Sequence, residues 1–438
     1  MRFMATDVAR ATNGELVGQN AHLVGASFDS RTIQPGQLFV PIVASNDGHD
    51  FIGHALQRGA GAYLTSRQFQ GRTAIVVQDT LKALMQLGSW GRDKLDAQLE
   101  NRIVAITGSV GKTTTKDFVA AALGDQFRVS ASERSFNNDQ GLPTAILNAR
   151  DDAQCLILEM GMRGFGEITR LCDIARPVIG VVTCVTETHT QRVGDIEGVA
   201  RAKSELPQSL PSAGTAILFA DNERVLNMAS LTKASVLTFG ESSGADIHVE
   251  SIRLDGQGKA TTDVNTPWGM CSFSLPIPGR HMALNAAAAI AVTGALGADI
   301  FIAANALESA PITPHRMQLR LLKNGALLLD DSYNASPVSM IAALETLGKM
   351  NARHRFAVLG LMAELANPED EHKRIATMAR DSSIQLIAVN TQMYGLPSRS
   401  FDQVVEELAE IGDGDVVVVK GSLVAGLSGL VDRLISGA

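Results

Sequence analysis

A glycine-rich turn between a β-branched run and an amphipathic run is the strongest constraint in this sequence. The run Ile103–Thr107 predicts a buried strand, and the segment from Lys112 to Leu123 predicts a helix. Glycines let backbone amides close around phosphate oxygens, the helix N-terminus and a lysine add positive charge, and a threonine hydroxyl can bind magnesium. Strand, turn and helix therefore predict a nucleotide phosphate site, in the short form of the motif, since Ile106 stands where the longer form has glycine. Its candidate residues are Gly108, Ser109, Val110, Gly111, Lys112, Thr113 and Thr114.

Length and composition indicate a globular protein of several domains. A chain of 438 residues is too long for a single hydrophobic core of ordinary size, and this length favours two to four domains, with three as the middle value. Hydrophobic residues make up 45% and charged residues 19%, so disorder is not expected. The net charge of -8 offers no basic surface to nucleic acid or to an anionic membrane.

Cysteine usage and the start of the chain favour a cytoplasmic protein. The cysteines stand singly without C-x-x-C spacing, which supports buried free thiols rather than a metal cluster or a disulfide framework. The first residues lack the basic and apolar regions of a signal peptide, and no apolar run of about 18 residues predicts membrane insertion. The cysteines are Cys155, Cys172, Cys184 and Cys271.

The apolar runs divide the chain into three domains of the α/β class. Residues 1–97 alternate short apolar runs with helical patterns, as in a small α/β domain. Residues 98–312 hold near-continuous apolar runs separated by helices, which predicts a parallel sheet covered on both faces. Polar alternation over 245–278 predicts an antiparallel addition to it. Residues 313–438 resume the βα alternation and predict a doubly wound, Rossmann-like domain.

Two chemically capable side chains follow buried strands of the middle domain. Glu159 ends the run Cys155–Glu159, and His189 lies just beyond the run Val178–Thr183. The carboxyl ends of parallel strands meet at one edge of a sheet, so both side chains are candidates to bridge a metal beside Lys112. The simpler alternatives are a glutamate that caps a helix or faces water, and a structural histidine.

The helix predicted from Ile196 carries Lys203 and Glu205. Its pattern alone indicates a solvated helix face, and nothing in the periodicity distinguishes the lysine.

In the third domain a buried strand is followed by acids, an aromatic and an amide. Asp331, Tyr333 and Asn334 can bond a ribose, stack on a base and fix a turn, although an Asx-rich turn before a helix at Pro337 explains most of the same residues. Arg316 follows a proline-bracketed linker, and it reaches the phosphates of the middle domain or sits at the surface.

Taken together, these segments resemble the Mur ligases over nearly the whole chain. Order and spacing agree as well as the motifs. The resemblance rests on Asp29–Arg31, Pro35–Phe39, Asp47–Phe51, the phosphate loop and Lys420–Ser422. The type that adds D-alanyl-D-alanine is most similar, through Ser135–Asn138, Gly141–Pro143, Asp330–Ala335, Leu359–Gly360, Met362, Glu364–Leu365 and His372.

The resemblance implies a middle domain that binds ATP and Mg²⁺. By motif position, Lys112 would hold the β and γ phosphates, Thr113 and Glu159 one magnesium, and His189 a second. Lys203 would be a lysine that is carbamylated and so becomes an anionic metal ligand. Asn285 and Arg316 would contact the adenine and the phosphates, and Asp331 the ribose.

The resemblance also implies the two other substrates. The first domain would bind UDP-N-acetylmuramoyl-tripeptide partly through Ser30 and Arg31, and the third would bind D-alanyl-D-alanine and close over ATP. Further substrate-binding residues would be Asn137, Asn138, Tyr333 and Asn334. The expected reaction, a step of peptidoglycan synthesis, passes through an acyl phosphate, and a monomer suffices because one chain supplies every part of the site.

Some positions depart from the pattern of the family. Glu187 adds a charge near His189, Leu361 replaces an aspartate, Ser336 replaces an asparagine, and Leu423 stands where an arginine is common. The alternatives are another ATP-dependent amide ligase, such as a folylpolyglutamate synthase or a Mur ligase for a different amino acid, and a catalytically silent nucleotide-binding homologue.

Overall fold

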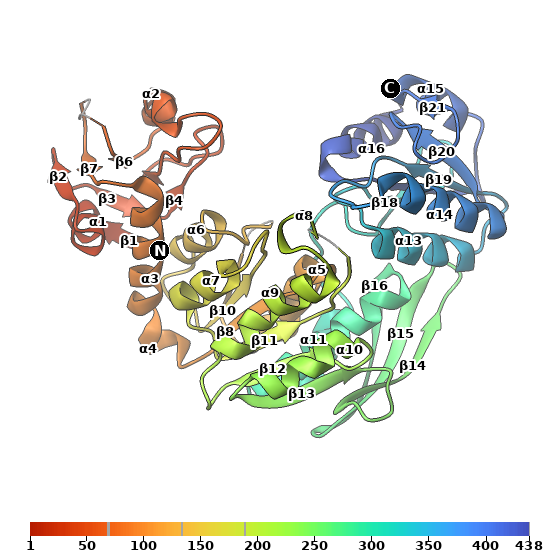
Figure 1. Cartoon of the computed structure of the whole chain (residues 1–438), viewed down its shortest axis with the longest axis horizontal. Coiled ribbons are helices and arrows are strands. Elements are labelled where there is room, and N and C mark those ends of the chain that lie inside the picture. The colour runs from red at the N-terminus through yellow and green to blue at the C-terminus, as the bar shows by residue number, and fades with distance from the viewer. Residues whose placement is uncertain (68–70, 133–134, 188–189, 438) are drawn as a thin grey trace.

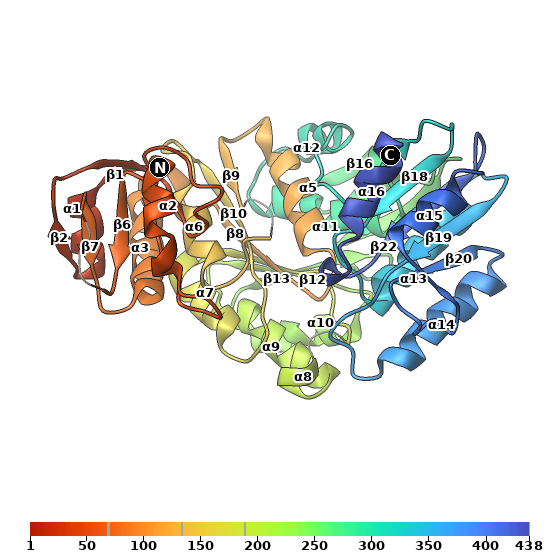
Figure 2. The same ribbon diagram turned by 90° about the horizontal axis from the view of Figure 1, so that it is seen from above.

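The computed structural model describes residues 1–67, 71–132, 135–187 and 190–437. Three α/β units follow one another, and the middle one lies between the other two in both views (Figures 1 and 2). This arrangement confirms the predicted fold class. In the described part of the chain, no helix is both long and apolar enough to cross a bilayer.

The first unit is a small sheet with helices packed against it. Its main sheet has the order β2-β7-β6-β5-β4, in which β2 is antiparallel to β7 and the other neighbours are parallel. The elements are β1 (Arg2–Met4), α1 (Ala5–Thr12), β2 (Glu15–Val17), β3 (His22–Val24), β4 (Ala26–Ser27), β5 (Leu38–Phe39), η1 (Gly48–Phe51), α2 (Ile52–Gln57), β6 (Ala62–Thr65), β7 (Ala74–Val76), α3 (Thr80–Lys94) and α4 (Asp96–Leu99).

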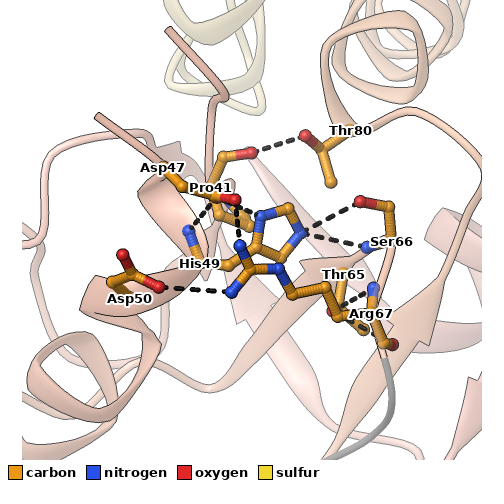
Figure 3. A network of polar contacts seen from close by, with 8 residues as sticks. All are labelled: Pro41, Asp47, His49, Asp50, Thr65, Ser66, Arg67 and Thr80. Atoms are coloured by element: carbon orange, nitrogen blue, oxygen red, sulfur yellow. Dashed lines mark hydrogen bonds and ion pairs between the residues drawn. The ribbon is translucent and has the colours of Figure 1, made fainter. Parts of the chain in front are cut away.

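A buried histidine ties two loops of this unit together (Figure 3). His49 Nδ1 lies 2.6 Å from Asp47 Oδ1, and its Nε2 accepts the backbone N–H of Ser66 at 3.1 Å. With Nε2 accepting, Nδ1 is the donor to Asp47. Arg67 also pairs with Asp47 and, at 3.2 Å, with Asp50. Hydrogen bonds from the backbone and ring of His49 lower the pKa of Asp47.

The central unit contains the predicted parallel sheet with its antiparallel addition. The strand order is β16-β15-β14-β13-β12-β11-β8-β10-β9, parallel from β9 to β14 and antiparallel from β14 to β16. The elements are β8 (Ile103–Thr107), α5 (Lys112–Gly124), β9 (Val129–Ala131), α6 (Gly141–Leu147), β10 (Cys155–Glu159), α7 (Glu167–Ala175), β11 (Ile179–Val182), α8 (Thr190–Val193), α9 (Ile196–Ser209), β12 (Thr215–Phe219), α10 (Glu223–Leu226), η2 (Asn227–Leu231), β13 (Ser235–Gly240), β14 (Ile247–Leu254), β15 (Lys259–Thr266), β16 (Gly269–Pro278), α11 (Arg280–Ala295) and α12 (Ile300–Leu307).

The third unit is doubly wound, as expected. Its sheet has the order β17-β18-β22-β19-β20-β21, and only the edge strand β17 runs antiparallel to its neighbour among the described strands. The elements are β17 (Gln318–Leu321), β18 (Leu327–Asp331), α13 (Pro337–Lys349), β19 (Arg355–Leu359), α14 (Pro368–Asp381), β20 (Gln385–Val389), β21 (Ser398–Arg399), α15 (Phe401–Leu408), β22 (Val416–Lys420), η3 (Leu423–Ala425) and α16 (Leu427–Ser436).

Apolar contacts join the first two units more closely than the sequence suggests. Helix α3 packs against α6 and α7 of the central unit. Leu84 and Leu87 of α3 share one buried cluster with Ile146 and Leu171. This packing holds the start of α3, with Leu81, against the central unit.

Candidate functional site

A cleft of about 880 Å³ lies between the central and third units. Its floor is the turn between β8 and α5 together with the end of β10. The third unit contributes the loops after β18 and β22, and α3 of the first unit contributes Leu81. The carboxyl ends of strands from both parallel sheets face this cleft, as expected for open α/β folds.

The turn between β8 and α5 is closely packed around its glycines. Gly111 has φ +85°, and a Cβ there would lie 2.7 Å from Asn285 Oδ1, so α11 brings this asparagine against the turn. A Cβ on Gly108 would lie 1.9 Å from Thr183 Oγ1. Lys112 Nζ donates to the carbonyl of Gly108 at 2.7 Å, and burial lowers its pKa. The Lys112 amine is therefore held against two carbonyl groups of the loop, Gly108 and Ser109, whose backbone N–H groups can bind phosphate.

A buried threonine and glutamate meet at the base of the cleft. Thr113 Oγ1 donates to Glu159 Oε2 at 2.7 Å, and Asn137 Nδ2 donates to Glu159 Oε1 at 2.7 Å. Glu159 is 1% exposed, so the simpler alternative, a glutamate at a strand end that faces water, is wrong. A hydroxyl and a carboxylate beside a phosphate loop suit Mg²⁺, which keeps several waters and uses few protein ligands. The described residues hold no cluster of three or more His, Cys, Asp or Glu arranged for a metal.

Arg316 reaches back from the third unit to the phosphate loop. Its Nη2 donates to Thr113 Oγ1 at 3.1 Å, and its guanidinium lies 4.2 Å from the ring centroid of Tyr333. Tyr333 in turn donates to Ser135 Oγ of the central unit at 2.7 Å. These contacts exclude a merely superficial position for Arg316.

Charged groups at the last residues of β18 and β22 form a second, mostly buried pair. Lys420 Nζ lies 2.5 Å from Asp331 Oδ2 and donates to the carbonyl of Asn334 at 2.9 Å. His281, in the first turn of α11, also lines the cleft. Burial lowers the pKa of His281 to about 4, opposed by the nearby Asp331, so its ring is neutral at pH 7.

Lys203 is buried, and the prediction of a solvated helix face is wrong for this residue. Its side chain is 1% exposed and lines the cleft from α9. Burial, with a smaller contribution from Lys112, lowers the pKa of Lys203 to about 7. Glu205 on the same helix accepts the backbone N–H of Gly166 at 2.6 Å and of Thr169 at 3.0 Å, so it caps the start of α7.

Other candidate residues lie farther from this constellation. Ser30 Oγ lies 3.0 Å from His54 Nδ1, and exposed Arg31 pairs with Asp29, both outside the lining of the cleft. Asn138 lines the cleft while its Oδ1 caps α6. The expectation for His189 lies outside the described residues.

The positions that depart from the family pattern differ in their surroundings. Glu187 is exposed. The carbonyl of Leu361 accepts the N–H of Ser422 at 2.9 Å. Leu423 lines the cleft and is 64% exposed.

The residue patterns of the sequence predict no role for Lys420, His281 or Ser135. Lys420 ends the apolar run Val416–Lys420, so the argument that strand ends converge could have found it. His281 and Ser135 carry no comparable local signal.

Comparison with known proteins assigns the family. Residues 106–293 match the Mur ligase middle domain, and residues 315–423 match the Mur ligase, glutamate ligase domain. A UDP-N-acetylmuramoyl-tripeptide--D-alanyl-D-alanine ligase of Mycobacterium tuberculosis is 34% identical, over 93% of this chain and 91% of its own length. The enzyme of the same name from Escherichia coli is 34% identical, over 89% and 86%.

Solved structures agree with the sequence comparison. A MurF from Acinetobacter baumannii superposes with a TM-score of 0.87 at 27% identity, covering 100% of this chain and 99% of that one. A MurF ligase from Thermotoga maritima in complex with ADP gives 0.79 at 25% identity, with 94% and 97% covered. A folylpolyglutamate synthase of M. tuberculosis, at 17% identity and a TM-score of 0.59 over 79% of this chain, shares the fold alone. The chain therefore belongs to the Mur ligase family, within its group of UDP-N-acetylmuramoyl-tripeptide--D-alanyl-D-alanine ligases.

Proposed function

We propose that this ligase joins UDP-N-acetylmuramoyl-tripeptide to D-alanyl-D-alanine and converts ATP to ADP and phosphate. The observation that carries the proposal is the contact of Thr113 with Glu159 beside Lys112, in a cleft of a chain 34% identical to relatives that bear this name. The product is the UDP-muramoyl-pentapeptide of peptidoglycan synthesis.

ATP occupies the cleft with its phosphates on the β8–α5 turn. Amides of the loop from Gly108 to Gly111, with Lys112 and Thr114, hold the β and γ phosphates. Asn285, packed against Gly111, contacts the adenine, and Asp331 the ribose. Arg316 is hydrogen bonded to Thr113 at the start of α5, and from there its guanidinium contacts the phosphates.

Thr113 and Glu159 would hold one Mg²⁺, since their oxygens already lie together in a buried, polar position. The ion would supply charge neutralisation for the transferring phosphate. Lys203 and His189 would hold a second.

The environment of Lys203 supports its carbamylation. Carbon dioxide adds only to a neutral amine, and a pKa of about 7 leaves a large neutral share at physiological pH. The ammonium form first gives up a proton, the neutral nitrogen attacks the carbon of CO₂ as one carbon–oxygen double bond opens, and the nitrogen releases a second proton, so that the lysine ends as a carbamate anion. That anion suits a site shared with Lys112, whose positive charge lies nearby.

The peptide substrates enter from the two outer domains. We assign residues 1–97 to the UDP end of the acceptor, with Ser30 and Arg31 as contacts, and residues 98–312 to ATP. Residues 313–438 hold the dipeptide and close over the nucleotide. Asn137 and Asn138 face the peptide from the central domain, and Tyr333 and Asn334 from the third. The enzyme acts as a cytoplasmic monomer.

Catalysis proceeds in two displacements. A carboxylate oxygen of the tripeptide attacks the γ phosphorus, the bond to ADP breaks, and an acyl phosphate forms. Lys112 offsets the repulsion between the anionic reactants. The amine of D-alanyl-D-alanine then attacks the acyl carbon and loses a proton, the carbon–nitrogen bond forms, and phosphate leaves. Closure of the third domain excludes the water that would hydrolyse the intermediate.

Phosphate release from ATP and Mg²⁺ tests the proposal directly. The purified protein is given UDP-N-acetylmuramoyl-tripeptide with D-alanyl-D-alanine, D-glutamate, lysine or diaminopimelate. We expect release only with the dipeptide, and a pentapeptide product by mass spectrometry. Phosphate release with another amine would refute D-alanyl-D-alanine as the substrate. ATP binding without phosphate release would indicate a catalytically silent homologue.

A further inference from the structure

Arg163 is an exposed cation on the wall of the cleft. It follows β10 by four residues and lines the cleft, with its side chain open to solvent. Among the described residues, no carboxylate pairs with its guanidinium. Lys420, by contrast, is paired with Asp331, and Arg316 is held by Thr113 and Tyr333.

The backbone around Arg163 is held by contacts on several sides. Its own N–H donates to Glu167 Oε2 at 2.7 Å, and Gly161 N–H donates to the carbonyl of Asn137 at 2.7 Å. Glu205 of α9 accepts the N–H of Gly166 at 2.6 Å. These contacts fix the backbone from which the Arg163 side chain leaves, so that the loop itself need not become ordered when the guanidinium binds a ligand.

A second helix contact supports the same loop. The guanidinium of Arg201 lies 5.2 Å from the ring centroid of Phe165. Helix α9 therefore reaches the loop twice, through Glu205 and through Arg201. Arg192 also lines the cleft, but it stands three positions after residue 189, and residues 188–189 are outside the described part of the chain.

The position of Arg163 points toward the acceptor rather than the dipeptide. Leu81, from α3 of the first domain, lines the same cleft, as does Met162, the chain neighbour of Arg163. Helix α7, which begins just after the Arg163 loop, packs against α3. This end of the cleft therefore lies next to the domain to which we assign the UDP end of the acceptor, and the dipeptide domain lies across the cleft.

We infer that Arg163 binds a non-reacting carboxylate of the acceptor peptide. A planar guanidinium matches a carboxylate with two parallel hydrogen bonds, and an unpaired one selects an anionic ligand. The nucleotide phosphates have their own cations in Lys112 and Arg316. Anchoring a second carboxylate would aim the reacting one at the γ phosphate, which makes Arg163 a determinant of acceptor specificity. This inference rests on the proposed function.

A coupling experiment tests it. Dissociation constants by calorimetry and KM values are measured for wild type and Arg163→Met, with the native acceptor and with an acceptor whose non-reacting carboxylates are amidated. We expect either change alone to weaken acceptor binding about 10- to 100-fold, as for one charge-assisted hydrogen-bonded pair. Both changes together should weaken it no further. KM for ATP and for the dipeptide should stay within about twofold, since general damage to the fold would alter all three.

Two further variants complete the design. Arg163→Lys keeps the charge and should recover part of the affinity. Arg224→Met removes a half-exposed arginine that pairs with Glu197 outside the cleft, and it should leave all of these constants unchanged. Additive losses from Arg163→Met and amidation, or a native acceptor affinity in Arg163→Met, would overturn the inference. Because calorimetry needs no turnover, absence of pentapeptide formation by wild type would refute the proposed function while leaving the carboxylate coupling measurable.

Discussion

Thr113 Oγ1 lies 2.7 Å from Glu159 Oε2 although the two residues are 46 positions apart in the chain. The strand β10 carries the glutamate to the same sheet edge at which α5 begins. Asn137 orients the other carboxylate oxygen at 2.7 Å. The pair is the centre of the proposed magnesium site.

Glu159→Gln keeps the shape of the side chain and removes its charge. We expect kcat to fall about 10²- to 10³-fold, a size typical for loss of one electrostatic contact to a transition state. The Mg²⁺ concentration that gives half-maximal phosphate release should rise. Glu167→Gln, which alters a carboxylate that braces the Arg163 loop, provides the comparison for Mg²⁺ dependence. An unchanged Mg²⁺ titration for Glu159→Gln would exclude Glu159 from the metal site.

Lys203 should make stability depend on pH. Its folded pKa is about 7, far below the ordinary value of about 10.4. The unfolded chain binds the extra proton between these values, so the cost of burying Lys203 is fully present below pH 7 and is relieved as pH rises toward 10. In CO₂-free buffer, the free energy of unfolding of wild type should rise relative to Lys203→Met across this window. Urea unfolding at pH 6.5, 8 and 9.5 measures it, and parallel curves would contradict the burial argument.

Activity should depend on carbon dioxide through the same residue. We expect wild type to lose most of its activity after dialysis in CO₂-free buffer near pH 6, where Lys203 is mostly protonated. Bicarbonate at pH 8 should restore it, whereas Lys203→Met should stay inactive in both conditions. Initial rates of phosphate release check this, and a wild type indifferent to bicarbonate would refute carbamylation.

Arg316→Ala should weaken nucleotide use. The variant loses both the hydrogen bond to Thr113 and the stacking on Tyr333, so we expect KM for ATP to rise about 10- to 100-fold. Tyr333→Phe keeps the ring and loses only the hydrogen bond to Ser135, and its KM for ATP should change less than about threefold. An equal rise in KM for ATP in Arg316→Ala and Tyr333→Phe would show that ATP binding depends on the contact between the domains rather than on the guanidinium.

His49→Ala should destabilise the first domain. The buried ring is bonded to Asp47 and Ser66 (Figure 3), and its removal takes away both hydrogen bonds and leaves a cavity between the two loops, while Asp47 keeps its pairing with Arg67. We expect a loss of about 2–4 kcal/mol in the free energy of unfolding. His22→Ala, at an exposed position, should stay within about 0.5 kcal/mol. Urea unfolding measures both variants. Equal free energies of unfolding for His49→Ala and His22→Ala would show that the His49 network does not stabilise the first domain.

Local sequence patterns determined the scaffold of this protein. The β-branched run Ile103–Thr107 became β8 with the same bounds, and the glycine turn leads directly into α5. The polar alternation over 245–278 became the antiparallel addition. Such features depend on periodicity and on backbone freedom within a few residues, and both can be read directly from neighbouring letters.

Tertiary packing alone decided the chemistry of several side chains. Lys203 lies on a helix whose pattern indicates solvent, yet contacts with other elements bury it and lower the pKa of its amine. Arg316 meets Thr113 across 203 positions, and Lys420 meets Asp331 across 89. Burial and pairing of this kind depend on how separate elements dock, and that docking energy is spread over apolar contacts that no single motif encodes.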